Sequence, residues 1–213
     1  KDVMEDLSAF HEKLITNSPT YAQAFAKATA SGSVIVRVGN IYEQAGSAEW
    51  LAERNVHLIE INPTIAVSKP RSRSSKAKED RKFDARLSLV FEMENAASFQ
   101  KFLEIDQKAE SGAFSSQQPI LSEVDKRLMR NNEDIGAVLY AKEIERQEFE
   151  NLRNVAQVEL ELEERGLGGK EGLNGEGRAF GSRSSFEKYF ELAVDEGHAQ
   201  QYLEIYDGLV KIE

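Results

Sequence analysis

The sequence predicts an α+β fold, in which a mixed or antiparallel sheet is flanked by amphipathic helices. Several segments repeat apolar residues every three or four positions, which is typical of helices with one buried face. Other segments are rich in β-branched residues or alternate apolar and polar side chains, which is typical of strands. The chain has 213 residues, 40% of them hydrophobic and 30% charged, so it is long enough to bury a core.

The first part of the chain predicts helices followed by strands. Residues 2–15 carry apolar side chains at helical spacing. Ser18 is expected to cap a second helix that begins with a proline, which is favoured at the first helical position. The β-branched run 33–38 predicts a strand, and residues 56–67 predict another. A short helix is expected between these strands, around Trp50.

Two later segments, 83–94 and 154–164, alternate apolar and polar residues and are therefore predicted strands. Each precedes a segment of the form Ser-Phe-x-Lys-aromatic, at 98–102 and at 185–189, where a helix is expected. The repetition suggests an internal duplication of a strand–helix unit.

These elements predict one α+β domain over 1–213, with a pseudo-repeat of 33–130 and 135–213. Two long flexible loops interrupt it. One is the exposed basic loop 69–82, which has no periodic apolar residues. The other is the glycine-rich loop 166–181.

The basic loop is the strongest functional signal in the sequence. It contains seven Lys or Arg residues and two acidic ones, so its net charge is about +5, whereas the whole chain has a net charge of -10. Such a segment favours an anionic partner. Nucleic acid is disfavoured, because no aromatic side chain lies between Lys69 and Lys82 to stack on bases and the chain as a whole repels a polyanion.

We therefore expect the basic loop to dock on an acidic strand surface of another copy of the chain. Head-to-tail contacts of this kind build rings or tubes. The predicted function is that of a non-catalytic structural subunit, a homo-oligomer or part of a larger virion, tail or secretion assembly, with no cofactor. The residues expected to make the contacts are Arg71, Arg73, Lys76, Lys78, Arg81 and Lys82 on the loop and Glu159, Glu161 and Glu163 on the acidic strand.

Two alternatives remain open at the level of sequence. The first is a metal-dependent nuclease or other phosphate-handling enzyme, with Glu60, Asp84 and Glu92 near strand ends as ligands of a divalent cation. The second is an effector or nucleic-acid-binding module that uses the basic loop.

Cysteine and histidine usage excludes several kinds of site. The chain has no cysteine, so disulfides, thiolate nucleophiles and cysteine-ligated zinc are excluded. His11-Glu12 begins like a metalloprotease motif but lacks its second histidine, because Ile15 stands there. His57 is expected to be a hydrogen-bonded structural residue, and His198 a surface residue in a turn.

No stretch approaches the eighteen apolar residues that a membrane span requires, and no charged-then-apolar leader opens the printed sequence. We therefore expect a soluble protein without a membrane partner, located in the cytoplasm or in a virion-like assembly.

Overall fold

The chain divides into two compact units, each built from two separate stretches of sequence. Unit 1 comprises Lys1–Phe99 and Asn151–Ser182, and unit 2 comprises Gln100–Glu150 and Arg183–Glu213. The units do not coincide with the predicted repeats. Two compact units can still fold as one domain, so the single domain stays a prediction. The computed structural model describes residues 3–39, 45–64, 76–117, 119–129, 134–181 and 185–210.

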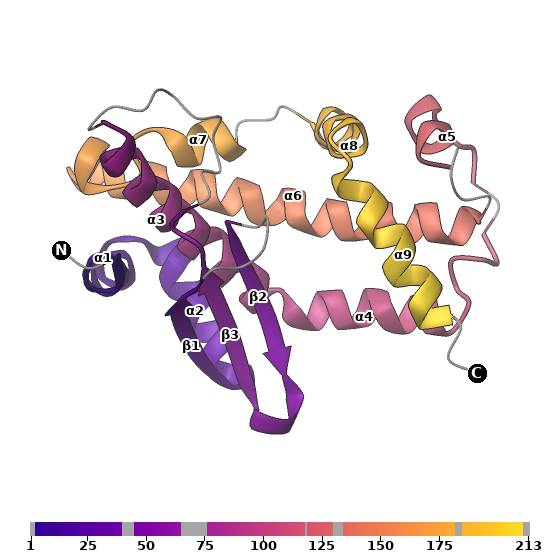
Figure 1. The fold of residues 1–213 in the computed structure, drawn as a ribbon, viewed down its shortest axis with the longest axis horizontal. Coiled ribbons are helices and arrows are strands. Elements are labelled where there is room, and N and C mark those ends of the chain that lie inside the picture. The colour runs from indigo at the N-terminus through magenta and orange to yellow at the C-terminus, as the bar shows by residue number, and fades with distance from the viewer. Residues whose placement is uncertain are drawn as a thin grey trace. The chain divides into compact units, whose positions relative to one another are not determined.

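The described residues form an α+β structure with nine α-helices and a three-stranded sheet, which confirms the predicted fold class (Figure 1). The helices are α1 (Val3–Asn17), α2 (Pro19–Ser31), α3 (Lys76–Ala97), α4 (Phe99–Glu110), α5 (Glu123–Met129), α6 (Ile135–Glu164), α7 (Glu176–Gly181), α8 (Phe186–Asp195) and α9 (His198–Val210). The strands are β1 (Ser33–Val38), β2 (Gly46–Leu51) and β3 (Val56–Ile61), and two short 3-10 helices cover Ala52–Arg54 and Gly169–Glu171.

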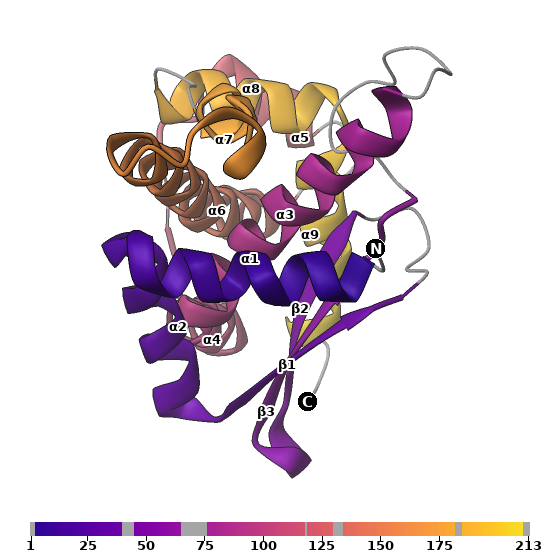
Figure 2. The same cartoon turned by 90° about the vertical axis from the view of Figure 1, so that its left-hand side faces the viewer.

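The sheet of unit 1 is mixed, with the strand order β1-β3-β2. β1 runs parallel to β3 and β2 runs antiparallel to it. Val36 of β1 and Ala48 of β2 are both paired with Ile59 of β3, so all three side chains lie on one face. This face packs against the core of the unit. Figure 2 shows the sheet nearly edge-on, with α2 on one side of it.

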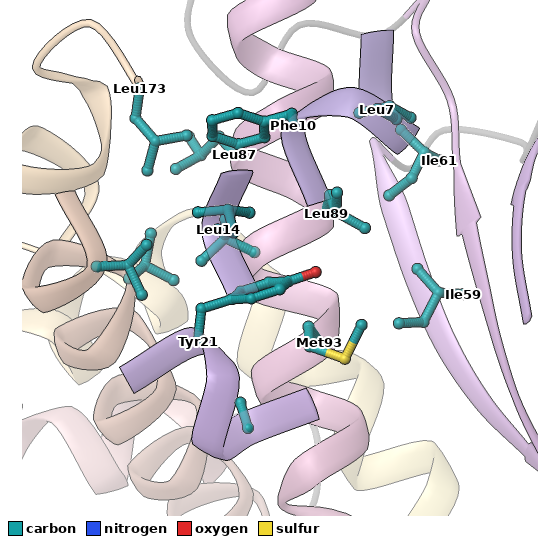
Figure 3. Packing of buried hydrophobic residues seen from close by; sticks show 14 of the residues in the cluster. Leu7, Phe10, Leu14, Tyr21, Ile59, Ile61, Leu87, Leu89, Met93 and Leu173 are labelled. Carbon is teal, nitrogen blue, oxygen red and sulfur yellow. The ribbon is translucent and has the colours of Figure 1, made fainter. Parts of the chain in front are cut away.

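The core of unit 1 lies between α1, α2, α3 and the inner face of the sheet. α1 buries Leu7, Phe10 and Leu14, whose spacing of three and four residues places them on one face of the helix. Figure 3 shows these side chains together with Tyr21 of α2 and Met93 of α3. Burying each large apolar side chain stabilises the folded state by about 1.5–3 kcal/mol.

α2 begins as the sequence predicts. Ser18 has an extended backbone with φ -123° and ψ 103°, and its hydroxyl accepts a hydrogen bond from the backbone N–H of Tyr21 at 3.1 Å. Pro19 is the first helical residue. The serine thereby satisfies a backbone donor that the first turn of any helix leaves without an internal partner.

The prediction of strands in the alternating segments is wrong, because both segments are helical. Residues 83–94 belong to α3, and residues 154–164 belong to α6. The predicted strand–helix duplication therefore has no strands. The short helix expected around Trp50 is likewise wrong, since this residue lies in β2.

The burial of these helices explains the error. Along α3 the buried side chains surround the helix axis instead of forming one stripe. Polar as well as apolar positions of the helix are therefore buried, and their alternation along the sequence does not indicate a strand. In α6 the fully buried residues Val155, Val158 and Leu162 follow helical spacing. Leu160, which the alternation places on the same face as Val158, is 39% exposed.

The two predicted loops have different outcomes. Residues 65–75, which include the first half of the basic loop, lie outside the described residues, but the backbone is helical from Lys76 onward, so the loop prediction is wrong for 76–82. The glycine-rich loop 166–181 is only partly a loop, since it contains a 3-10 turn and α7. Leu173 within it is fully buried in the core of unit 1, which fixes this segment to the unit.

Unit 2 contains helices and no strand among its described residues. The part of α6 that belongs to it packs with aromatic residues of α8, since the ring of Phe149 lies 5.4 Å from that of Tyr189 and 6.0 Å from that of Phe186. Ser185 caps α8 with an extended backbone and accepts a hydrogen bond from the N–H of Lys188. These contacts hold α8 in place, and α8 contributes to the site described below.

Unit 1 also buries an incompletely paired carboxyl group. Glu94 of α3 is 4% exposed and accepts a hydrogen bond at 2.8 Å from the side-chain amide of Asn154 in α6. Its other oxygen, Oε1, is buried with no hydrogen-bond partner among the described residues. Burial disfavours the charged form and raises the pKa of Glu94 from its ordinary 4.5 to about 7.

We expect this group to make stability depend on pH. Between about pH 4.5 and about pH 7 Glu94 loses its proton in the unfolded chain but keeps it in the folded chain. Ionisation therefore stabilises the unfolded state, and the free energy of unfolding falls as pH rises. Above about pH 7 the cost is constant, at about 3 kcal/mol. The free energy of unfolding of Glu94→Gln, relative to that of the wild type, should therefore rise by about 2 kcal/mol from about pH 5 to about pH 8, as measured by urea unfolding. The exposed substitution Glu53→Gln is the control, and parallel pH curves for all three proteins would contradict the prediction.

Candidate functional site

The most concentrated group of titratable side chains in the described residues lies in unit 2. Glu145 and Glu148 are three residues apart on α6, so they share one face of that helix. His198 is the first residue of α9, Tyr202 lies one turn further along the same helix, and Tyr189 lies on α8. Three helices thus direct polar groups to one place.

Each carboxylate of this cluster has one oxygen bound by a tyrosine and the other near the histidine. The hydroxyl of Tyr189 donates to Oε2 of Glu145 at 2.7 Å, and that of Tyr202 donates to Oε1 of Glu148 at 2.6 Å. Nδ1 of His198 lies 2.8 Å from Oε1 of Glu145 and 3.7 Å from Oε2 of Glu148. The hydroxyl of Tyr189 also lies 3.4 Å from Oε2 of Glu148.

The cluster is buried on the α6 side and open to solvent on the α9 side. The side chain of Glu145 is fully buried and that of Glu148 is 12% exposed, whereas that of His198 is 43% exposed. The part of the cluster that contacts solvent is therefore the His198 side.

The electrostatics of the cluster favour a positive charge at its centre. Burial lowers the pKa of His198, but the hydrogen bond with Glu145 and the charges of both carboxylates outweigh burial and raise that pKa to about 9. Burial raises the pKa of Glu148, and the neighbouring charge of Glu145 acts in the same direction. Burial and the two carboxylates also raise the pKa values of Tyr189 and Tyr202, so both tyrosines remain hydrogen-bond donors.

This arrangement has the donor types of a metal site. One nitrogen of His198 and one oxygen from each of Glu145 and Glu148 lie within 4.8 Å of one another. Within the described ranges, no other group of three His, Asp or Glu side chains converges in this way. Carboxylate oxygens and imidazole nitrogens are common ligands of divalent cations in proteins.

The carboxylates that the sequence suggested as metal ligands do not converge. Asp84 and Glu92 lie on the same helix, eight residues apart, which corresponds to about 12 Å along its axis. Both are buried in unit 1, and Glu92 accepts a hydrogen bond from the side-chain amide of Asn95 at 3.0 Å. Glu60 lies on β3 and forms an ion pair with Arg37 at 2.7 Å. The three residues therefore do not form a shared site.

The acidic strand surface expected to receive the basic loop is part of helix α6, and its carboxylates have structural roles within unit 1. Glu159 is 1% exposed and accepts the backbone N–H groups of Gly175 and Arg178, at 2.5 and 2.8 Å. It thereby ties the start of α7 to α6. Glu163 forms an ion pair with Arg178 at 2.9 Å.

Glu161 serves the beginning of α2. It accepts the hydroxyls of Ser18 and Thr20, each at 2.6 Å, and the backbone N–H of Thr20 at 3.1 Å. Burial raises the pKa of Glu161, but these hydrogen bonds outweigh burial and hold the pKa below its ordinary value. Residues 159–163 are helical, so Glu159, Glu161 and Glu163 do not form the strand surface that the sequence predicts.

The basic residues of the expected contact can be placed only in part. Arg71 and Arg73 lie outside the described residues. The first turns of α3 contain the backbone of Lys76, Lys78, Arg81 and Lys82. Docking of the basic segment on another copy stays a prediction.

The histidines have mixed outcomes. His57 is 2% exposed and its Nε2 lies 2.7 Å from the hydroxyl of Ser31, which confirms a hydrogen-bonded structural role. His11 contacts the hydroxyl of Tyr21 at 2.8 Å. His198 is exposed, as the sequence predicts, but it begins α9 and contacts Glu145, which the sequence does not indicate. The spacing of Glu145 and Glu148 could have indicated a paired acidic face on one helix, but nothing in the sequence joins that face to a histidine fifty residues later.

Comparison with known proteins gives no family for this chain: no family model matches it, and neither the curated proteins nor the solved structures include a significant match. The geometry of the site is therefore the basis for a functional proposal.

Across the part of the chain that the structure describes, no helix combines the length and the apolar character that crossing a bilayer demands.

The structural role of Glu159 can be tested directly. Glu159→Gln keeps one acceptor oxygen and loses the other, so one partly buried backbone N–H is left without its partner. We expect a loss of about 1–3 kcal/mol in the free energy of unfolding by urea, with no change in molar mass. Glu164→Gln, which changes an exposed residue of the same helix, should cost little. A change in molar mass without loss of stability would instead favour Glu159 as part of a docking surface.

The charge on His198 should make stability depend on pH in the alkaline range. Because its folded pKa is raised from 6.5 to about 9, its contribution is complete below about pH 6.5 and is lost as pH rises through about 9. After allowance for solvent screening of this partly exposed side chain, we expect a contribution on the order of 1 kcal/mol. The stability difference between the wild type and His198→Gln, measured with a chelator present, should shrink over this range. A difference that is constant with pH would contradict the assignment.

Proposed function

We propose that the protein binds a divalent transition-metal ion in unit 2, through Glu145, Glu148 and His198. The observation that carries the proposal is the convergence of one donor atom from each of these residues within 4.8 Å. The proposal concerns described residues of one unit only and does not depend on how the two units are arranged.

The distances between the donor atoms are close to those of a metal site. Metal–nitrogen and metal–oxygen bonds of about 2.1 Å place neighbouring ligand atoms about 3.0–3.4 Å apart in octahedral or tetrahedral geometry. The two distances from Nδ1 of His198, 2.8 Å to Glu145 and 3.7 Å to Glu148, lie on either side of this range. Small side-chain rotations are enough to admit an ion between them.

The tyrosines supply the support that metal ligands require. The shortest tyrosine hydrogen bonds, from Tyr189 and Tyr202, go to the oxygen of each carboxylate that lies away from His198, so the other oxygen of each is directed at His198. Hydrogen bonds of this kind orient ligands and increase metal affinity. The charges also match. A divalent cation balances the two carboxylates, whereas protonated His198 alone supplies one positive charge.

The donor set indicates the class of metal. One imidazole and two carboxylates suit Zn²⁺ or Mn²⁺ better than Ca²⁺, which prefers six to eight oxygen ligands. Three protein ligands leave at least one coordination position for solvent, which is typical of open sites. That position would face the exposed side of His198.

Isothermal titration calorimetry of the full chain with Zn²⁺ and with Mn²⁺ tests the proposal. After treatment with a chelator and removal of any purification tag, we expect one ion per chain, with a dissociation constant on the order of 1 µM or tighter for the preferred ion. Glu148→Gln and His198→Gln should each weaken binding at least about tenfold, because each removes one ligand. Glu150→Gln, an exposed change two residues away on the same helix, is the matched control.

A second variant separates metal binding from the integrity of the fold. Tyr202→Phe removes a hydrogen-bond donor but no ligand, so it should lower stability without metal while keeping a stoichiometry of one ion. Circular dichroism of each variant establishes that it is folded. If neither ion binds the folded wild type, or if Glu148→Gln and Glu150→Gln bind equally well, the cluster is a closed network of hydrogen bonds and the proposal fails.

A further inference from the structure

The edge of the sheet in unit 1 provides a second, independent observation. β1 is an outer strand, and no strand among the described residues pairs with its far side. The backbone N–H groups of Ser33 and Gly39 bond to the β3 side, at 3.0 Å each, to Asn55 and Ile61. Since backbone groups alternate along a strand, Val34, Val36 and Val38 direct theirs to the open side.

The outer face of β1 is also incompletely covered. The inner residues Val34, Val36 and Val38 pack on the core, and Ile35 between them is 49% exposed. Ile35 is paired with Leu58 of β3 on the same outer face. An apolar strip thus continues from the second strand of the sheet to its open edge.

β1 lacks the devices that usually keep an edge strand from pairing with another chain. Natural edges carry unpaired charges, prolines or bulges. The one charged residue of β1, Arg37, is bound by Glu60 on the neighbouring strand at 2.7 Å. β2, the other edge, has the exposed Glu49 at its centre. β1 is therefore the edge that favours pairing.

We propose that two copies of the chain associate through β1, as antiparallel strands related by a two-fold axis at Ile35. In this register Val34 of one copy faces Val36 of the other, and both residues direct their backbone groups to the open side, so each such pair exchanges two hydrogen bonds. Ile35 then faces its own copy as a close pair without hydrogen bonds, with Cα atoms about 4.5 Å apart.

β1 is self-complementary in this register, which is why the partner that pairs with it is a second copy of the chain. A two-fold interface requires that one patch fit itself. The exposed Ile35 side chains bury each other, and the long side chain of Arg37 faces the small Ser33 of the second copy, so like charges do not meet. The result is a continuous sheet of six strands.

Salt distinguishes this contact from docking of the basic segment. The β1 contact is held by backbone hydrogen bonds and apolar burial, while the net charge of -10 on each chain opposes association. Raising the salt concentration screens that repulsion and should preserve or strengthen the dimer. A contact between the basic segment and carboxylates should weaken under the same change.

Molar mass by light scattering and sedimentation tests the proposal on the full chain, up to about 300 µM protein. One pair of strands is smaller than a standard interface, so we expect a weak dimer with a dissociation constant on the order of 10–100 µM. It should persist from about 50 mM to about 500 mM salt. Ile35→Lys should weaken it at least about tenfold, because a charge on the strip opposes pairing.

Two further variants complete the test. Ile205→Lys changes an apolar residue of similar exposure, 46%, in unit 2, and should leave the dimer intact. Val36→Pro removes a backbone donor on the open side and should give a monomer, with circular dichroism establishing that it is folded. A monomeric wild type at both salt concentrations, or a dimer that folded Ile35→Lys and Val36→Pro leave unchanged, would overturn the proposal. Loss of the dimer at high salt would also overturn it and would favour the basic segment.

Discussion

The enclosure of α3 is the constraint on which unit 1 depends. This helix packs against α1, α2 and the sheet, and its side chains are buried around its axis, including the polar residues Ser88, Glu92 and Glu94. Buried polar groups are costly unless they are hydrogen-bonded. The second stretch of unit 1 supplies such partners: Asn151 bonds to Asn95 and Ser98, and Asn154 bonds to Glu94. Two distant parts of the chain are thereby joined through polar contacts as well as through the apolar core.

Carboxylates inside the protein occur in three settings, which differ in the groups that donate hydrogen bonds to them. Glu159 and Glu161 accept backbone N–H groups near the beginnings of α7 and α2, where unpaired helix donors attract anions. Glu94 has only a neutral amide, and burial raises its pKa. Glu145 and Glu148 share the cationic His198 and two tyrosine hydroxyls. Some of the acidic residues of the chain therefore have structural roles inside the fold and do not simply cover its surface.

The two proposals place separate activities on the two units. The cluster of unit 2, for which we propose ion binding, has carboxylate and imidazole donors, and it is buried on the α6 side and exposed at His198. Among the residues that the structure describes, the edge strand β1 of unit 1 is paired on one side only, and its apolar residue Ile35 is half exposed. Because the two features share no residue, ion binding and association can be measured and lost independently of each other.

The sequence by itself determined the local elements whose signals are short-range. Helical spacing in α1, the serine and proline that begin α2, and the β-branched run of β1 each predict the observed structure. These signals depend on neighbouring residues, and the α+β class follows from them. The cysteine-free composition likewise excludes several kinds of site without any structure.

Only the tertiary structure decided the rest, because burial is a property of the surroundings of a helix. The alternation at 83–94 resembles that of a strand, yet the segment is a helix buried on all sides. Glu159 looks like a surface acid in the sequence but is enclosed by α7. The cluster of Glu145, Glu148 and His198 exists only because the packing of α8 and α9 on α6 brings residues fifty positions apart within hydrogen-bond distance. A pattern of neighbours along the chain contains no information about such a contact.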